Sequence, residues 1–158
     1  MIELVQTMEP ELIARLVQIE TEAFGPGGLN EWHLQPLIRH GRVYVYRSQT
    51  EIVGLVHYML DWDHPQKAYM VGVSISKESR GQGIGAKLLK ESFAALAKEN
   101  IEEVELTVDP DNVAAVKLYE SKLGFSVTDF KHDEYGKGEG RQVMKLILAD
   151  FAKNTFKE

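Results

Sequence analysis

The sequence predicts a mixed α/β domain on one central sheet, with about seven strands and about four helices. Two kinds of apolar pattern predict this class: apolar residues recur at helical spacing in some segments and alternate in others, and the two kinds are interspersed along the chain. No repeat, low-complexity tract or linker divides the 158 residues, which have the size of one ordinary domain. We therefore expect a single domain over residues 1–150 and a tail over residues 151–158.

The first elements are one strand and two helices. Residues 2–5, Ile-Glu-Leu-Val, suit a short first strand. Apolar residues recur at helical spacing over residues 10–22, and the glycine-rich stretch 25–28 ends that helix. Asn30 is placed to cap a second short helix, which Gly41 stops.

Three strands are expected next. Residues 43–46 and 52–60 are rich in β-branched and aromatic side chains, and a tight polar turn at 48–50 joins them. Residues 61–66 form a polar loop, and residues 69–75 form a third apolar strand.

The second half alternates helices and strands. Residues 84–100 carry the apolar stripe of a helix, and residues 104–108 alternate as a strand does. Residues 112–123 are expected to be helical, and residues 125–130 and 142–148 to be the last two strands, joined by a polar hairpin loop.

Composition excludes several classes of function. The apolar share of 44% and the charged share of 27% are typical of a soluble globular protein. The absence of cysteine excludes disulfides, thiolate catalysis and cysteine-based zinc sites. No apolar run reaches the roughly 20 residues of a membrane span, and the N-terminus does not have the pattern of a signal peptide. We expect a cytoplasmic protein, and the net charge of −6 argues against broad nucleic-acid binding.

The glycine-rich segment at residues 74–86 is the most informative part of the chain. It has the pattern of a strand end, a short polar turn and the first turn of a helix, with glycines at positions 81, 83 and 85. Glycine lets the backbone approach a ligand closely, and a helix N-terminus presents unpaired N–H groups at the positive end of its dipole. The segment therefore predicts a binding site for a phosphate-bearing molecule.

Two phosphate-binding motifs compete for this segment. A P-loop needs Lys-Ser or Lys-Thr after its final glycine, and Gly85 is followed by Ala86-Lys87-Leu88, so this motif fails. A dinucleotide fingerprint matches formally at Gly81-x-Gly83-x-x-Ala86, with Glu103 and Glu105 near the distance of the ribose-binding acid. That match is short. The fingerprint of a dinucleotide-binding unit normally follows the first strand of the unit, whereas three strands precede the match here.

A third interpretation uses more of the chain. Arg80-x-x-Gly83-x-Gly85 resembles a signature of the GNAT family of N-acetyltransferases. Asn112-x-x-Ala115-x-x-Leu118-Tyr119, followed by Gly124-Phe125, resembles that family's second conserved segment at the usual separation. The element order also resembles the GNAT acyl-CoA N-acyltransferase fold, and the resemblance spans about the whole domain.

The resemblance implies acetyl-CoA as co-substrate and no metal. The pyrophosphate would lie on backbone N–H groups of Gly81, Gln82, Gly83, Ile84, Gly85 and Ala86. Arg80 would add charge or brace the turn. The main chain of Val73, Ser74 and Ile75 would hydrogen-bond the pantetheine amides.

Two residues of the second segment are implied at the coenzyme. Asn112 would hydrogen-bond it, and the same side chain could cap the helix that follows. Tyr119 is the catalytic candidate, because the matching tyrosine of the family protonates the departing CoA thiolate. A phenol of ordinary pKa ~10 is a suitable donor to a thiolate. A tyrosine that only packs under the coenzyme is the alternative.

The usual base is missing. The positions at which relatives carry a glutamate are Val71 and Thr107 here, and neither can accept a proton. The remaining candidates are acidic or basic residues of the segments that line the acceptor side in relatives: Glu22, Glu31, Asp61, Asp63, His64 and Glu134.

The acceptor site is expected to involve Glu22, Glu31, Trp32, Asp61 and Tyr135. Trp32, Trp62 and Tyr135 would form an aromatic wall or serve as ordinary packing residues. His57 with the compact Asp61-Trp62-Asp63-His64 could suggest a metal site, but no second cluster supports it.

The resemblance predicts an N-acetyltransferase that moves an acetyl group from acetyl-CoA to a primary amine, on a small molecule or a peptide N-terminus, by direct attack on the thioester. The alternatives are a non-catalytic acyl-CoA-binding or regulatory module on the same fold and, from another class, a dinucleotide-binding protein. We expect no nucleic-acid or membrane partner, and a homodimer is one candidate assembly.

Overall fold

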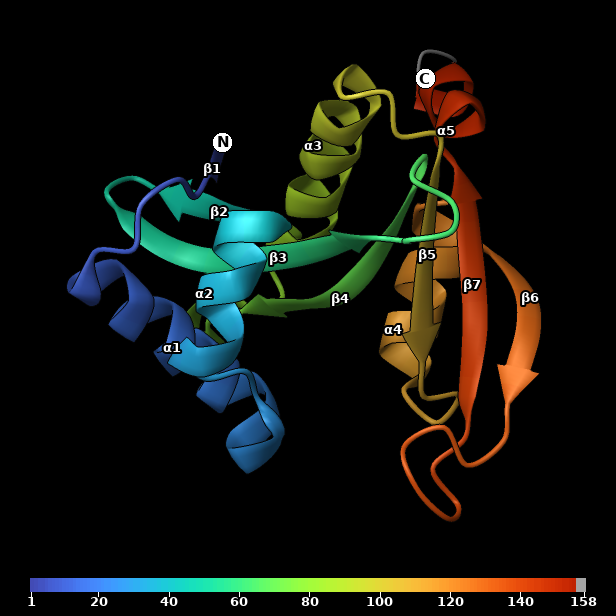
Figure 1. Ribbon diagram of the computed structural model, residues 1–158, viewed down its shortest axis with the longest axis horizontal. Coiled ribbons are helices and arrows are strands. Elements are labelled where there is room, and N and C mark those ends of the chain that lie inside the picture. Colours follow the sequence, from blue (N-terminus) through green and yellow to red (C-terminus); the bar gives the residue numbers. More distant parts are fainter. Residues whose placement is uncertain (156–158) are drawn as a thin grey trace. The chain divides into compact units, whose positions relative to one another are not determined.

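The structure, a computed structural model, describes residues 1–155 and contains one mixed sheet of seven strands (Figure 1). The strands follow the order β1-β2-β3-β4-β5-β7-β6 across the sheet. Their bounds are β1 (Ile2–Leu4), β2 (Arg42–Ser48), β3 (Glu51–Leu60), β4 (Lys67–Ile75), β5 (Glu103–Val108), β6 (Ser126–Lys131) and β7 (Arg141–Ile147). The α-helices of the described residues are α1 (Pro10–Phe24), α2 (Glu31–His40), α3 (Ile84–Lys98), α4 (Val113–Lys117) and α5 (Leu148–Thr155). The predicted mixed α/β class is confirmed.

The C-terminal end differs from the prediction. Leu148 was expected to end the last strand, but β7 ends at Ile147 and a helix runs from Leu148 to Thr155. Leu148 is buried, and its N–H donates to the carbonyl of Glu102, so tertiary packing fixes the start of a helix that is only eight residues long. Residues 156–158 lie outside the described part of the chain.

The predicted helix at residues 112–123 has two parts. α4 is followed directly by a π-helical turn, Leu118–Lys122, in which the N–H of Leu123 donates to the carbonyl of Leu118 at 3.1 Å. Such π turns inside helices often occur at functional sites, and the catalytic candidate Tyr119 lies in this one.

The chain forms two compact units. The first comprises residues 1–59 and 70–93, and the second comprises residues 60–69 and the chain from Ala94 onward. β4 is shared, since Met70–Ile75 belong to the first unit and Lys67–Tyr69 to the second.

The first unit has helices on both faces of its strands. Successive strand residues point to opposite faces: His57 of β3 contacts α1 through Glu20, and the hydroxyl of Tyr58 lies 2.7 Å from that of Ser92 on α3. The buried cluster on the α1 and α2 side consists of Val5, Ile13, Leu16, Ile19, Leu34, Ile38, Val43, Val45, Ile52 and Leu55. Each fully buried Leu, Ile or Val side chain contributes about 1.5–3 kcal/mol, so this cluster holds α1 and α2 firmly on the sheet.

The second unit has one apolar and one polar sheet face. On β5, the side chains of Val104, Leu106 and Val108 are buried. The opposite face carries Glu105 and Thr107, which pair in register with Lys145 and Val143 of β7. β4 extends this face through its parallel pairing with β5, in which Tyr69 lies beside Glu105. A β-bulge between Val127 and Asp129 of β6 re-aims the residues at the edge of this face.

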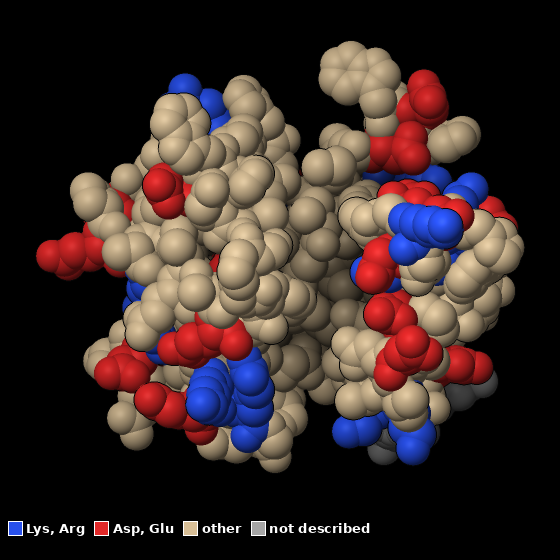
Figure 2. Space-filling model, turned by 90° about the horizontal axis from the view of Figure 1, so that it is seen from below, with Lys and Arg blue, Asp and Glu red and all other residues tan. Residues whose placement is uncertain are grey.

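The surface carries charges of both signs. On the face drawn in Figure 2, acidic and basic side chains lie close to one another and do not gather into one large basic field. Within residues 1–155, no helix is long and apolar enough to cross a membrane.

Candidate functional site

The glycine elbow, residues 80–86, presents bare backbone at the start of α3. Gly81 and Gly83 have φ of +78° and +76°, which L side chains rarely adopt, and no atom lies within 4 Å of where a Cβ would stand at either. The first helical hydrogen bond runs from the N–H of Lys87 to the carbonyl of Gly83 at 3.2 Å. The N–H groups of residues 84–86 therefore have no acceptor within the helix and are free to bind an anion.

The remaining residues of the elbow, Gly85, Arg80 and Gln82, differ in their surroundings. Gly85 lies within α3 and has ordinary φ, so it is not required by backbone conformation. The Nε of Arg80 donates to the carbonyl of Ile75 at 3.1 Å, so Arg80 braces the end of β4 against the turn. Gln82 is exposed at the turn. A ligand at the elbow would therefore meet backbone N–H groups and no lysine of residues 80–86.

The strand before the elbow separates its main chain from its side chains. Val73 and Ile75 are half-buried, and Ser74 is buried with its hydroxyl donating to Oε1 of Glu20 at 3.1 Å. The Ser74 side chain is therefore committed to the interior of the first unit. Only main-chain groups at this position can serve a ligand, as the predicted role in pantetheine binding requires.

Glu20 is the centre of a buried polar cluster. It is 1% exposed; its Oε1 lies 2.8 Å from Nε2 of His57, and its Oε2 accepts the N–H of Leu29 at 3.2 Å. Burial alone would raise the pKa of Glu20, but the hydrogen bond and charge of His57, with the Leu29 N–H and the Ser74 hydroxyl, outweigh it and hold the pKa below its ordinary value. The cluster joins α1, β3, β4 and the segment before α2.

The sequence held a signal for this cluster that the prediction missed. Glu20 follows Ile13 and Leu16 on the same helical face, so a carboxylate stands on an apolar stripe. His57 likewise interrupts the apolar run of β3. The ring of His57 lies against Gly72, where an added Cβ would stand 2.9 Å from Cε1, and Nδ1 is buried without a hydrogen-bond partner among the described residues.

Asn112 and Tyr119 lie in the second unit. The Asn112 side chain accepts the N–H of Ala115 at 3.2 Å, which confirms that it caps α4. Tyr119 is 8% exposed and packs edge-to-face on Phe125, with 5.7 Å between ring centroids. Burial raises the pKa of Tyr119 to about 12, so the phenol keeps its proton near neutral pH and can donate it. Among the described residues, its hydroxyl has no hydrogen-bond partner.

Three of the predicted acceptor residues, Glu22, Glu31 and Trp32, lie in the first unit. Glu22, near the end of α1, accepts the N–H of Lys77 at 3.0 Å and holds the turn that precedes the elbow. Glu31 begins α2 and lines a cavity of about 500 Å³ with residues of α1. Trp32 is 81% exposed. Their roles toward an acceptor stay predictions.

The 61–66 loop is organised by Asp61. Its Oδ1 accepts the N–H groups of Asp63 and His64, and its Oδ2 lies 3.3 Å from Nζ of Lys67. These bonds outweigh desolvation and hold the pKa of Asp61 below its ordinary value, so its carboxylate is a weak base. Trp62 in the same loop is 97% exposed. Among residues 1–155, no group of three or more His, Asp or Glu side chains is placed to hold a metal ion.

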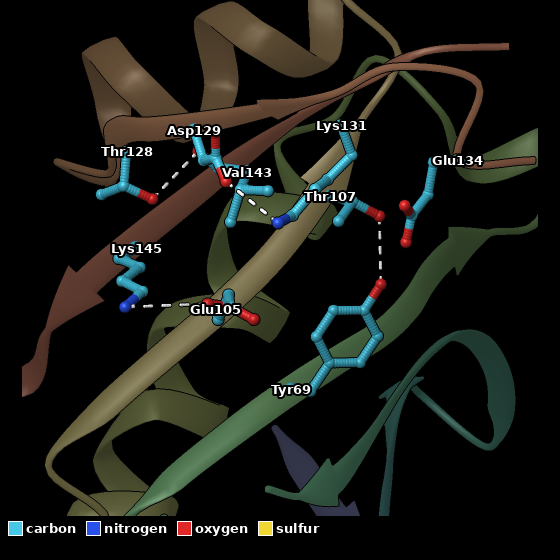
Figure 3. A pocket seen from close by; sticks show the side chains of 9 residues that line it. All are labelled: Tyr69, Glu105, Thr107, Thr128, Asp129, Lys131, Glu134, Val143 and Lys145. Atoms are coloured by element: carbon cyan, nitrogen blue, oxygen red, sulfur yellow. Dashed lines mark hydrogen bonds and ion pairs between the residues drawn. The ribbon is translucent and has the colours of Figure 1, made fainter.

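A pocket of about 430 Å³ opens on the polar face of the second unit (Figure 3). Its lining residues come from β4, β5, β6, β7 and the hairpin loop, and they are Tyr69, Glu105, Thr107, Thr128, Asp129, Lys131, Glu134, Val143 and Lys145. The hydroxyls of Tyr69 and Thr107 lie 3.0 Å apart. Burial, the neighbouring Tyr135 and the charge of Glu105 raise the pKa of Tyr69 to about 12 against the lowering effect of Thr107.

This pocket contains one residue that the sequence had offered as a base, Glu134, at the position facing Thr107. Tyr69 was not predicted to be functional, although the alternation of polar residues at Glu105 and Thr107 marked this face of the sheet as polar. Tyr135, the predicted acceptor residue of the hairpin loop, is 62% exposed and stacks under Arg141.

Comparison with known proteins supports one family. The family model for the acetyltransferase (GNAT) family matches residues 10–125. The N-alpha-acetyltransferase of Sulfolobus acidocaldarius is 26% identical over 147 residues, covering 86% of this chain and 87% of that protein. The mycothiol acetyltransferase of Kocuria rhizophila is 43% identical over 63 residues, covering 40% of this chain and 20% of that protein.

A solved structure shares the fold. The Bacillus subtilis acetyltransferase in complex with CoA superposes with a TM-score of 0.73 at 16% identity, covering 92% of this chain and 97% of that chain. In other curated relatives the matched part is smaller: the chain spans 20% and 19% of the length of two mycothiol acetyltransferases and 39% of an N-alpha-acetyltransferase of Schizosaccharomyces pombe. Because the family model covers most of its residues, the chain belongs to the acetyltransferase (GNAT) family.

Proposed function

We propose that the protein is an N-acetyltransferase that transfers the acetyl group of acetyl-CoA to a primary amine. The observation that carries this proposal is the glycine elbow, where two glycines in left-handed conformation precede the free N–H groups of α3. A diphosphate binds such a site through backbone N–H groups and the helix dipole. Family membership and the acetyltransferase names of the relatives support the choice of coenzyme.

In this proposal the coenzyme is held mainly by main chain. Gly81 to Ala86 would bind the pyrophosphate, and the main chain of Val73 to Ile75 would bind the pantetheine amides. Asn112 would add a side-chain hydrogen bond while keeping its cap on α4. The commitment of Ser74 to Glu20 agrees with this division, because it leaves the strand's backbone as the polar surface.

Tyr119 would supply the proton for the leaving group. The amine nitrogen attacks the thioester carbonyl, the C–N bond forms, and the C–S bond breaks. The nitrogen loses one proton to solvent as the amide forms. The thiolate then takes the phenolic proton of Tyr119, which solvent restores. A pKa of about 12 keeps this proton on the phenol until the thiolate appears.

Two measurements test the proposal. Calorimetry should show that acetyl-CoA binds and that NAD does not; the reverse result would favour a dinucleotide-binding protein. A thiol-release assay with acetyl-CoA should then show turnover with at least one member of a panel of small amines and peptides. Tight coenzyme binding without turnover on any amine would favour the non-catalytic acyl-CoA-binding module.

A further inference from the structure

The pocket on the polar face of the second unit has one carboxylate, Glu134, that forms no ion pair among the described residues. Lys131 lies 3.0 Å from Asp129, and Glu105 lies 3.3 Å from Lys67 and 3.8 Å from Lys145. These contacts pair the other charged groups of the lining. Glu134 makes no ion pair or hydrogen bond among the described residues, although its charge adds to that of Asp129 in raising the pKa of Lys131.

The hairpin loop holds Glu134 in place from both sides. Asp133, at φ +53°, accepts the N–H of Gly138 with its side chain at 2.7 Å. Tyr135 donates its N–H to the carbonyl of Glu139 and stacks its ring under Arg141 at 5.0 Å. These contacts fix the backbone on both sides of Glu134, and the Glu134 side chain lines the pocket from this loop.

The carboxylate of Glu134 points toward two hydroxyls. In Figure 3 it extends from the loop toward the bonded pair of Tyr69 and Thr107. A carboxylate and two hydroxyl oxygens are the acceptors that an ammonium group with three N–H donors requires. The cavity volume of about 430 Å³ lies within the range of small-molecule sites.

We propose that this pocket receives the ammonium group of the acceptor, and that Glu134 binds the ammonium and takes one of its protons. This inference rests on the proposed function. Glu134 thereby replaces the base missing at Val71 and Thr107. Thr107 keeps a place in the site as a hydroxyl partner of Tyr69. The acceptor class is a primary alkylammonium, carried by a small diamine or by a peptide N-terminus.

The proton balance is complete without a further reactant. The ammonium gives one proton to the Glu134 carboxylate, and the neutral amine attacks the thioester carbonyl. The nitrogen loses a second proton to water as the amide forms, and Tyr119 protonates the thiolate. Glu134 releases its proton to solvent, since its side chain is exposed, and Tyr119 regains one from solvent, so that one proton is released in each cycle.

The first test compares E134Q with the wild type across pH. The control is E51Q, an exposed carboxylate in the first unit. With 1,4-diaminobutane, E134Q should lower kcat/KM about 100-fold near neutral pH, and the loss should shrink as pH approaches the pKa of the amine. With 2,2,2-trifluoroethylamine, which is largely neutral at pH 7, the loss should be within a few-fold. A loss independent of pH and of the amine, or no loss, would overturn the proposal.

A second measurement does not depend on catalysis. NMR titration with 1,4-diaminobutane, and separately with the tripeptide Ala-Ala-Ala, should shift the signals of Tyr69, Thr107 and Glu134 in the coenzyme-free protein. E134Q should weaken this binding, and the probe that binds more tightly identifies the source of the ammonium. Amine binding without coenzyme binding would uphold the amine pocket and refute the proposed function. Coenzyme binding without shifts at these three residues would refute the amine pocket and leave the proposed function standing.

Discussion

The glycine elbow of the first unit and the pocket of the second unit present their polar groups in opposite ways. The elbow offers backbone N–H groups at the start of one helix, and its shape depends on the left-handed conformation of Gly81 and Gly83. The pocket offers side chains from four strands and one loop, and none of its lining residues is a glycine. A site made of backbone leaves a compact trace in the sequence, whereas a site made of side chains is scattered along it.

The two units also treat carboxylates differently. Glu20 of the first unit is buried, and its carboxylate is hydrogen-bonded to the Leu29 N–H, the His57 ring and the Ser74 hydroxyl. These bonds stabilise the fold. Glu134 of the second unit is exposed and has no ion-pair partner among the described residues. The contrast separates a carboxylate that stabilises the fold from one that is available to a substrate.

Removing the buried carboxylate should have the largest effect. Glu20→Ala leaves the His57 ring and the Ser74 hydroxyl without their partner. It should lower the free energy of unfolding by about 2–4 kcal/mol, because each buried polar group left unsatisfied costs about 1–3 kcal/mol. Glu22→Ala, two residues further along α1, removes one exposed hydrogen bond and should cost about 1 kcal/mol. Urea denaturation measures both, and equal effects would contradict the assignment of Glu20.

Acid should remove the advantage of Glu20. Its pKa in the folded protein lies below the ordinary value of 4.5, so the stabilisation is present above that value and is lost as pH falls through the folded pKa. The difference in stability between the wild type and Glu20→Ala should therefore shrink on acidification below about pH 4.5. A difference that stays constant or grows would show that the charge of Glu20 does not stabilise the fold.

The catalytic candidate of the second unit should affect chemistry and not stability. Tyr119→Phe removes a hydroxyl without a partner among the described residues, so the unfolding free energy and the acetyl-CoA affinity should hold. Turnover should fall about 100-fold, since a general acid is lost. Thiol-release kinetics and calorimetry measure the two effects, with Tyr46→Phe on β2 as the matched control. Unchanged turnover in Tyr119→Phe would remove this residue from the acid role.

The elbow should respond to a single methyl group. Gly83→Ala forces an L side chain into φ +76° at a cost of about 1–2 kcal/mol and fills the space beside the free N–H groups. Acetyl-CoA affinity should fall about tenfold. Gly138→Ala meets the same backbone strain at φ +81° in the other unit and should leave coenzyme affinity unchanged. Equal losses in calorimetry would mean that strain alone, without a local ligand, explains the effect.

Local patterns predicted the glycine elbow at the start of α3 and most of the fold. The elbow, the cap at Asn112 and the alternation of β5 each depend on residues close in sequence. α5 was missed because the burial of Leu148 and its bond to Glu102 are tertiary contacts. The π-helical turn at Tyr119 likewise depends on packing, and the residue types of the segment do not predict it.

The pocket could not be assembled from the sequence for a geometric reason. Tyr69 and Thr107 are separated by 38 residues and meet only because β4 and β5 pair in parallel. Glu134 lines the same pocket from the β6–β7 hairpin loop, and the bulge after Val127 lies on the strand that leads into this loop (Figure 3). The sequence could name Glu134 as one of several candidate bases, but the structure was needed to separate it from Glu22 and Asp61, whose carboxylates are engaged by backbone N–H groups.

The most direct test of the proposed function follows the acetyl group itself. The protein is incubated with acetyl-CoA labelled in its acetyl group and with an amine that supports thiol release, and the free thiol and the labelled amide are quantified together. Direct transfer predicts equal amounts of thiol and labelled amide at every time point. Thiol release without labelled amide, or no release with any amine while acetyl-CoA binds, would contradict the assignment as an N-acetyltransferase.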